Sequence, residues 1–399
     1  MKQKFTANIF MKTFNVALAA LATISWARIG GVEVFGLVSG FTFATFILAE
    51  IIDYGNSTTV ARNALKEKLD YSQWLNEIPR IISRYIICLI PLFLVLVIFP
   101  IPNKLTYALL LLNMPFLMIN VYFQQFAYGF SKLKQVSAGV IIEKIFWFAV
   151  IPLNLFNYNP IITIPISILL GSLAQNIYAL VEIQVSTKSQ GFRLSKSYFR
   201  IANEGNIRHG NIDISAFRII GNLFYLDVSM IGLLAGSTAA GHYAAGARLR
   251  SILTIGFTSV SDLVGPKLIN HLDWRSVVVR RDHIVVLSVN TLGCIITFLL
   301  ARPLTVLLLG SEFLESVFFV KCFAITCLVL GIVTILRTIL VSLFFEGYVG
   351  IIYILGFLFN VCCFPFVVFQ FGSQGVAVLA LVTQMSIGLL LFVRLIKVK

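Results

Sequence analysis

The chain has 399 residues, of which 58% are hydrophobic and only 12% are charged, and its mean hydropathy is +0.92. These values exclude a water-soluble globular protein and indicate a polytopic membrane protein. The net charge of +14 suggests nucleic acid as a partner, but the charges follow membrane topology, as described below, so we expect no nucleic-acid binding.

Apolar stretches of about 20 residues, each long enough to cross ~30 Å of hydrocarbon, account for most of the chain. We therefore expect an all-α fold of about 12 transmembrane helices. Lys2, Lys4 and Lys12 precede or open the first stretch, which lacks a small-residue cleavage site, so it is expected to be retained. The predicted spans are 9–27, 34–52, 81–101, 105–127, 136–156, 160–182, 213–235, 240–262, 284–301, 316–340, 350–370 and 375–393.

Lysine and arginine are concentrated in alternate loops. With the N-terminus inside, only Arg28, Lys104, Arg302 and Lys321 fall in outer segments. The positive-inside rule then predicts that both termini are cytoplasmic. The longest polar segment, 183–212, is basic, and we interpret it as a cytoplasmic linker between an N-terminal bundle, 1–182, and a C-terminal bundle, 213–399.

The six cysteines all fall within predicted spans, and the four histidines are scattered along the chain. Their spacing matches neither a disulfide framework nor a metal site. We therefore expect the cysteines to be apolar packing residues and expect no metal.

The stretch 211–250 contains the strongest functional signal. Arg218 and Asp227 lie inside the apolar span 213–235, where each charge costs roughly 2.5–3.5 kcal/mol at mid-helix. Helical spacing places Arg218 on one polar face with Asn211, Ser215, Asn222, Tyr225, Ser229, Gly232 and Gly236. Such a face predicts a transport path, and a polar seam between helices is the alternative. Asp227 lies about 180° round the helix from Arg218, so its partner is expected on a neighbouring helix.

Other charged residues also fall within spans. Arg248 and Arg250 accompany hydroxyl residues in 240–262, and two arginines in such a helix indicate an anion site, because a guanidinium offers paired donors to phosphate. Arg337 lies in 316–340 and is a further cationic candidate. An outer anchor for lipid headgroups is the alternative for Arg248. Glu143 is a candidate proton-sensitive carboxylate, and it points about 100° away from the adjacent Lys144, so the two are not expected to face each other.

The first two spans meet at a tight outer turn. Arg28 and Glu33 bracket this turn, and its glycines allow two helices to approach closely. Gly31 and Gly36 have the same spacing as Gly236 and Gly241, which also precede a span, and this suggests an internal repeat.

The cytoplasmic end of the second span holds acidic residues. Glu50 and Asp53 lie near this end, and Arg62 follows. They are either solvated charges at the interface or parts of a gate that pairs with basic residues in one conformation only.

Three motifs resemble those of a known family. They are Arg28-Ile29-Gly30 with Phe35-Gly36, Asp53-Tyr54-Gly55 with Arg62, and Gly241-His242-Tyr243. At these motifs the chain resembles the polysaccharide-exporter branch of the multidrug/oligosaccharidyl-lipid/polysaccharide exporter superfamily, and most of all the Wzx-type O-antigen flippases.

The resemblance implies a bacterial inner-membrane protein of two six-helix bundles around a central cavity. It implies translocation of an undecaprenyl-pyrophosphate-linked oligosaccharide repeat unit to the periplasmic leaflet by alternating access. Other membrane proteins of glycan assembly are candidate partners, and the hypothetical driving ion is H+ or Na+, with no other cofactor. We expect substrate binding at Arg28, Arg218, Arg248, Arg337, Asn222, Tyr225 and Ser229, and ion coupling or gating at Asp227, Glu143, Glu50, Asp53 and Arg62.

Two other functions compete with this interpretation. A multidrug exporter of the same fold needs acidic residues to bind cationic drugs, whereas this interior is richer in arginine. A polymerase or glycosyltransferase is expected to carry a large outer loop, whereas the predicted outer loops are short. The short outer loops lead us to expect a transporter and not an enzyme. The sequence also lacks a phosphate-binding glycine-rich loop with lysine and a nucleophile-elbow motif, so we do not expect ATP-driven transport within this chain.

Overall fold

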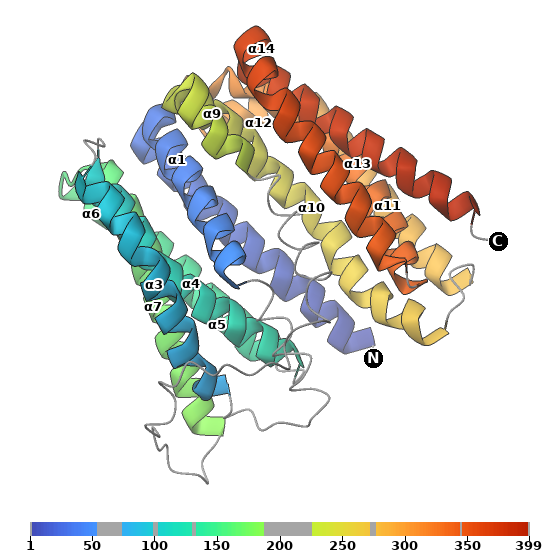
Figure 1. Ribbon diagram of the computed structural model, residues 1–399, viewed down its shortest axis with the longest axis horizontal. Coiled ribbons are helices and arrows are strands. Elements are labelled where there is room, and N and C mark those ends of the chain that lie inside the picture. Colours follow the sequence, from blue (N-terminus) through green and yellow to red (C-terminus); the bar gives the residue numbers. More distant parts are fainter. Residues whose placement is uncertain are drawn as a thin grey trace. The chain divides into compact units, whose positions relative to one another are not determined.

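The computed structural model describes residues 2–53, 74–98, 103–129, 133–186, 226–271, 277–343 and 345–397, and these ranges contain helices and short turns but no strand (Figure 1). The helices are α1 (Lys2–Asp53), α3 (Trp74–Ile98), α4 (Lys104–Gly129), α5 (Leu133–Trp147), α6 (Val150–Leu155), α7 (Pro160–Ser186), α9 (Asp227–Ala235), α10 (Ser237–His271), α11 (Val277–Leu299), α12 (Ala301–Leu308), the 3-10 helix η5 (Ser311–Phe313), α13 (Ser316–Ser342) and α14 (Glu346–Lys397).

The described helices are those of a membrane protein. Six are long and apolar enough to cross a bilayer, or seven if α11 and α12, bent by 77° relative to each other, form one broken span. The prediction of an all-helical polytopic membrane protein is therefore confirmed. The number of twelve spans stays a prediction, because part of the chain lies outside the described ranges.

Two of the longest helices are each broken by a glycine. Gly31 in α1 has φ 68°, and Gly372 in α14 has φ 62°, values that residues with a side chain rarely adopt. In α14 the two halves fold back on each other. Their contact is seen at Gly356 of the first half, where an added Cβ would lie 2.8 Å from Cδ1 of Ile387 in the second half. Both breaks lie where the sequence predicts a turn between two spans.

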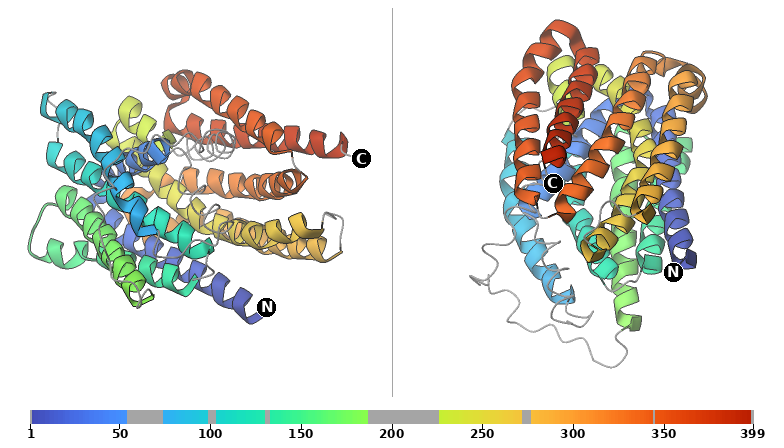
Figure 2. Two further views of the ribbon diagram at one scale, coloured as in Figure 1. Left: turned by 60° about the horizontal axis from the view of Figure 1, so that its bottom comes forward. Right: turned by 90° about the vertical axis from the view of Figure 1, so that its right-hand side faces the viewer.

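The described residues divide into two compact units. The first comprises α1 up to Gly40 and the helices from α9 onward. In it α10 packs against α11 and α13, and α13 packs against α14; these helices lie side by side in every view (Figures 1 and 2).

The second unit comprises the described residues from Phe41 to Ser186. In it α7 packs against α4 and α5, and α3 packs against α4. Its apolar core is formed largely by α3 and α4 and includes Tyr85, Met114, Met118 and Phe123. The Tyr85 hydroxyl donates to the Ala49 carbonyl oxygen at 2.7 Å, which fastens the end of α1 to α3.

Most of the predicted linker lies outside the described residues, so the division into 1–182, 183–212 and 213–399 stays a prediction. The predicted site residues Arg62, Arg218, Asn222 and Tyr225 lie outside them as well. Glu50 and Asp53 fall in the last turn of α1, and only the backbone of these two residues is described.

Candidate functional site

A buried carboxyl and a buried phenol form the centre of the candidate site. Asp227, the first residue of α9, is only 5% exposed, and its Oδ2 accepts a hydrogen bond from the Tyr243 hydroxyl at 2.9 Å. Tyr243 belongs to α10 and is 2% exposed. The expectation that Asp227 finds its partner on a neighbouring helix is confirmed, and that partner is a neutral hydroxyl.

A cation and two aromatic rings complete this group, which we call the Asp227 cluster: Asp227, Tyr243, Arg250, Phe319 and Phe323. The Arg250 guanidinium lies 5.0 Å from the centre of the Phe323 ring and interacts electrostatically with both the Asp227 carboxyl and the Tyr243 phenol. The Tyr243 ring meets the Phe319 and Phe323 rings edge-on at 5.5 and 5.1 Å. Burial makes the charged form of a carboxyl costly, so a carboxylate in this setting can be neutralised by a proton or compensated by a small bound cation.

The helices that carry the cluster are joined to α1 through glycines. A Cβ at Gly36 would collide with the Ser237 carbonyl oxygen and the Gly241 backbone, and one at Gly241 would collide with the Val32 carbonyl oxygen. The two backbones therefore touch, as small residues allow in membrane helices. Beside this contact the Ser229 hydroxyl donates to the Gly40 carbonyl oxygen at 2.5 Å.

The contact involves corresponding members of the suggested glycine repeat. Gly31 and Gly236 both have positive φ, 68° and 91°, and each opens the helix that follows it. Gly36 and Gly241, the second members, are the residues that meet. The repeated spacing thus corresponds to a repeated local structure, a glycine break followed by a close helix contact.

Arg28 binds the end of a helix. Its Nε donates to the Leu308 carbonyl oxygen at 2.8 Å, and its Nη2 donates to that of Leu307. These carbonyls end α12, where backbone acceptors lack partners within the helix and attract positive charge. The structure therefore places the Arg28 side chain against the end of α12, and substrate binding by Arg28 stays a prediction.

Further contacts surround this end of α12. The rings of Phe35 and Phe313 meet edge-on at 5.9 Å. His242 Nδ1 lies 3.1 Å from the Ser316 hydroxyl, and His242 Nε2 lies 3.3 Å from Glu315 Oε2. The segment from α12 to α13 is thus held to both α1 and α10.

The other predicted arginines have different surroundings. Arg248 lies two residues before Arg250 on α10, on the helix that carries the Asp227 cluster. Arg337 of α13 is hydrogen-bonded to Tyr353 of α14, so it joins these two helices. Arg394, not predicted as a site residue, lies 4.7 and 5.1 Å from the ring centres of Phe345 and Tyr348.

Glu143 lies in the second unit and is paired locally. It is 7% exposed, and its Oε1 is 2.9 Å from Nζ of Lys144, which also lies 3.2 Å from the centre of the Trp147 ring. The expectation that Glu143 and Lys144 do not face each other is wrong. Their Cβ atoms diverge, but the long lysine side chain reaches back to the carboxylate.

A polar seam between α4 and α7 is a further feature that sequence reasoning missed. Nδ2 of Asn120 and Nδ2 of Asn176 both donate to the Ser172 carbonyl oxygen, at 3.3 and 2.7 Å, and Asn176 also donates to the Phe116 carbonyl oxygen at 3.0 Å. The spacing of Ser172 and Asn176, one helical turn apart, is the signal that could have identified it.

Sequence reasoning also did not assign Tyr243 and Phe323 to the site. The Gly241-His242-Tyr243 motif is the sequence signal that could have identified Tyr243. Phe323 gives no such signal in an apolar helix. Among the described residues, no three His, Cys, Asp or Glu side chains come together as a metal site.

Comparison with protein families gives one match. A family model described as "Polysaccharide biosynthesis protein" matches residues 1–264. No curated protein sequence matches the chain.

Solved structures show which fold the chain shares. The lipid II flippase MurJ in its inward closed conformation aligns with a TM-score of 0.65 at 14% identity, covering 98% of this chain and 87% of MurJ. The MATE multidrug transporter DinF-BH gives 0.67 at 12% identity, covering 100% and 96%. The Vibrio cholerae MATE transporter VcmN in its bent form gives 0.59 at 14% identity, covering 99% and 97%. The chain has the fold of these transporters.

Proposed function

Since the chain belongs to the polysaccharide biosynthesis protein family, we propose that it is a flippase for an undecaprenyl-pyrophosphate-linked oligosaccharide, an O-antigen repeat unit or a similar one. The oligosaccharide crosses from the cytoplasmic to the periplasmic leaflet of a bacterial inner membrane. Two bundles of six helices, with both termini in the cytoplasm, alternate the access of a central cavity to the two leaflets.

The family match is the observation that carries this proposal. A polysaccharide biosynthesis protein can act on sugars as an enzyme or move a lipid-linked intermediate across the membrane. The similar solved structures are transporters and a flippase, and the chain aligns with MurJ over nearly its whole length. A shared fold alone does not fix the substrate, so the transported class follows from the family.

The chemistry of the first unit supports an anionic substrate. A diphosphate in a low-dielectric cavity needs positive charge, and we assign this role on α10 to Arg248. Arg250, two residues further on, points to another side of the helix and belongs to the Asp227 cluster. On the predicted polar face Arg218, Asn222 and Tyr225 add a further cation and groups that bind sugars, beside Ser229. Arg28 and Arg337 are the other proposed cationic groups.

The Asp227 cluster supports coupling to an ion. We assign Asp227 the binding of H+ or Na+, because its carboxyl has one neutral hydrogen-bond donor and lies on the helix that contacts α1. Glu143 is a second candidate in the other unit. Glu50, Asp53 and Arg62 are proposed to form the cytoplasmic gate.

A genetic experiment tests the proposed function. The gene is deleted from a host that makes the corresponding surface polysaccharide and is complemented with wild type, Arg248→Ala, Arg248→Lys or, as control, Arg302→Ala at an exposed position of α12. Deletion should abolish surface polymer while lipid-linked single units accumulate on the cytoplasmic side. We expect Arg248→Ala to lower surface polymer about tenfold or more, because it removes charge-assisted bonds to phosphate, and Arg302→Ala to match wild type.

Two other outcomes would contradict the proposal. If single units reach the periplasm without being polymerised, the protein is a polymerase. If surface polysaccharide is unchanged and the deletion strain becomes sensitive to cationic drugs, it is a multidrug exporter.

A further inference from the structure

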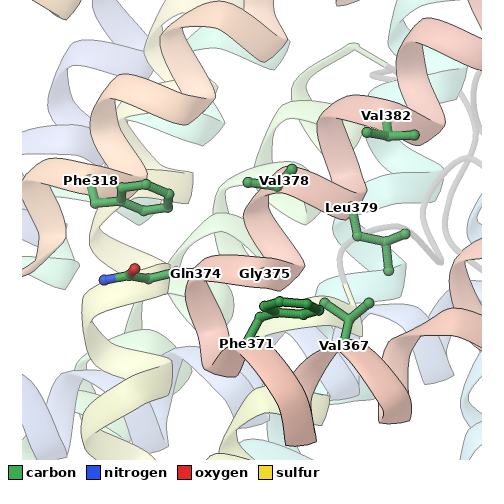
Figure 3. A pocket seen from close by; sticks show the side chains of 8 residues that line it. All are labelled: Phe318, Val367, Phe371, Gln374, Gly375, Val378, Leu379 and Val382. Atoms are coloured by element: carbon green, nitrogen blue, oxygen red, sulfur yellow. The ribbon is translucent and has the colours of Figure 1, made fainter.

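Apolar hollows of the first unit differ in the side chains that line them. The hollow at the turn of α14 has a volume of about 500 Å³ and is lined by Gln374 and apolar residues, with no reactive group among them (Figure 3). A smaller hollow, of about 220 Å³, lies between α11 and α13 and has Cys294 in its wall. The smaller hollow can therefore bring an apolar molecule to a thiol.

The Cys294 thiol has a second thiol beside it. Cys294 of α11 and Cys327 of α13 are hydrogen-bonded to each other, and they are 1% and 0% exposed. Two sulfurs that are already in contact need only a short approach to reach the ~2.05 Å of a disulfide. The pair is therefore placed to form a bond between α11 and α13.

Polar groups flank both sulfurs. Nδ2 of Asn290, one turn before Cys294 on α11, donates to Cys294 Sγ at 3.3 Å. The Cys327 thiol donates to the Arg250 carbonyl oxygen at 3.7 Å. An N–H donor stabilises the negative charge that develops on a sulfur as its proton leaves, and a thiol reacts in that form. Cys294 is therefore the sulfur prepared to attack, and Cys327 joins the pair to the Asp227 cluster through Arg250.

The route to Cys294 leads through hydrocarbon. Exposed apolar side chains border the hollow, among them Phe298 and Leu299 of α11 and Ile325 of α13. Both α13 and the broken span of α11 and α12 are apolar enough to cross a membrane. Exposed side chains change rotamer rapidly, and such changes uncover the sulfur behind them. A molecule that reaches Cys294 by this route must dissolve in the bilayer, so charged oxidants are excluded.

We propose that Cys294 and Cys327 form a redox site whose substrate is an apolar organic hydroperoxide. The Cys294 sulfur attacks the peroxide: an S–O bond forms, the O–O bond breaks, and the thiol proton passes to the leaving oxygen, which gives an alcohol and a sulfenic acid. The Cys327 sulfur then attacks the sulfenic sulfur and displaces water, which carries away the Cys327 proton and leaves a disulfide. The two thiols together give up two electrons, which the peroxide takes up.

The disulfide changes the surroundings of the Asp227 cluster. It fixes α11 to α13, and it removes the hydrogen that Cys327 donates to the Arg250 carbonyl oxygen. Because Arg250 acts electrostatically on Asp227, we expect the oxidised protein to export less lipid-linked oligosaccharide. This consequence rests on the proposed function, whereas the oxidation itself does not.

Oxidation of the full-length protein in phospholipid nanodiscs tests the site. The probe is cumene hydroperoxide, followed by alkylation of free thiols and peptide mass spectrometry. We expect a disulfide between Cys294 and Cys327, which dithiothreitol removes. Cys327→Ala should abolish this crosslink, and Cys322→Ala, the matched control on the same helix, should leave it unchanged. Absence of the disulfide in wild type would overturn the site and leave both cysteines as packing residues.

Two comparisons test the route through the hollow. Hydrogen peroxide, which is polar, should form the disulfide more slowly than cumene hydroperoxide at the same concentration. Ile325→Trp fills the hollow and should slow the reaction with cumene hydroperoxide about tenfold. Leu292→Trp, at a 60% exposed position of α11 outside the hollow, should react like wild type. Equal rates in wild type and Ile325→Trp would overturn this route.

The effect on export is measured in cells. Brief exposure to cumene hydroperoxide should lower surface polymer in wild type and lower it less in Cys294→Ala or Cys294→Ser. An equal fall in wild type and both variants would overturn the consequence for export. If deletion of the gene leaves surface polymer unchanged, the proposed function fails, while the disulfide formed in nanodiscs still decides whether the redox site exists.

Discussion

At the scale of single residues, the environment of Asp227 determines what its carboxyl can do. It is buried, it accepts one hydrogen bond from Tyr243, and the Arg250 guanidinium acts on it from the same helix as Tyr243. A buried carboxylate without a directly bonded cation is costly, and binding a proton or Na+ removes part of that cost. The binding of an ion by the Asp227 carboxyl can therefore be coupled to the packing of α9 against α10.

Replacing Asp227 with asparagine tests this coupling. Asn keeps an acceptor for the Tyr243 hydroxyl but cannot change its charge. We expect Asp227→Asn to fold with unchanged or higher thermal stability and to lose the dependence of export on the H+ or Na+ gradient. Export is measured as surface polymer in cells with the gradient intact or collapsed. Full export that still follows the gradient would exclude Asp227 as the coupling residue.

Tyr243→Phe is the matched variant for the same pair. It leaves the buried carboxyl without its hydrogen-bond donor, so the free energy of unfolding should fall by about 1–3 kcal/mol. Tyr158→Phe, at a 59% exposed tyrosine, should change it little. In the Asp227→Asn background the loss from Tyr243→Phe should be smaller, because the group left unpaired is then neutral.

At the scale of helices, the contact between α1 and α10 depends on two glycines. A side chain at either Gly36 or Gly241 meets backbone atoms of the other helix, and backbone cannot move aside as a flexible side chain can. The same contact positions Ser229, whose hydroxyl binds the Gly40 carbonyl oxygen. The path predicted along this face of α9 thus depends on how closely α1 approaches it.

Gly241→Ala should separate these two helices. Overpacking of this kind costs about 1–3 kcal/mol, so the variant should unfold at a lower temperature and export less repeat unit. Gly350→Ala, in α14, is the control, because a Cβ there has nothing within 4 Å and alanine favours a helix. Thermal unfolding in detergent compares the two variants. Equal stability of Gly241→Ala and wild type would show that α1 and α10 do not touch in the protein in solution.

At the scale of the whole molecule, the distribution of charge predicts the orientation in the membrane. Basic residues are concentrated in alternate segments of the chain, and the positive-inside rule assigns these segments to the cytoplasm. We therefore expect the polar turn around Tyr158 and the segment around Gly310 to lie outside, with both termini inside.

Reporter fusions test this arrangement. Alkaline phosphatase inserted after Tyr158 or Gly310 should be active, because it folds only outside the cytoplasm, and a fusion at Lys399 should be inactive. A fluorescent protein that folds only in the cytoplasm, fused at Lys399, should give the complementary result. An active phosphatase at Lys399 would mean an odd number of spans or the opposite orientation.

The sequence by itself determined that the chain is an all-helical membrane protein, and its predicted spans left gaps at 28–33 and 371–374, where Gly31 and Gly372 break the helices. Hydrophobicity and backbone freedom are properties of a short stretch, so composition and glycine position reveal them. Local sequence is also the basis of three further predictions: the polar face around Arg218, the cytoplasmic gate and the linker.

Only the tertiary structure decided which residues meet. Arg28 binds the Leu308 carbonyl oxygen 280 positions away, Gly36 meets Gly241, and Asp227 is bonded to Tyr243. Helical periodicity gives the face on which a residue lies but not the helix that covers that face. Which helix covers a given face depends on how helices far apart in the sequence pack. The distance between two backbones, and the atoms that a side chain can contact, are determined by both helices together.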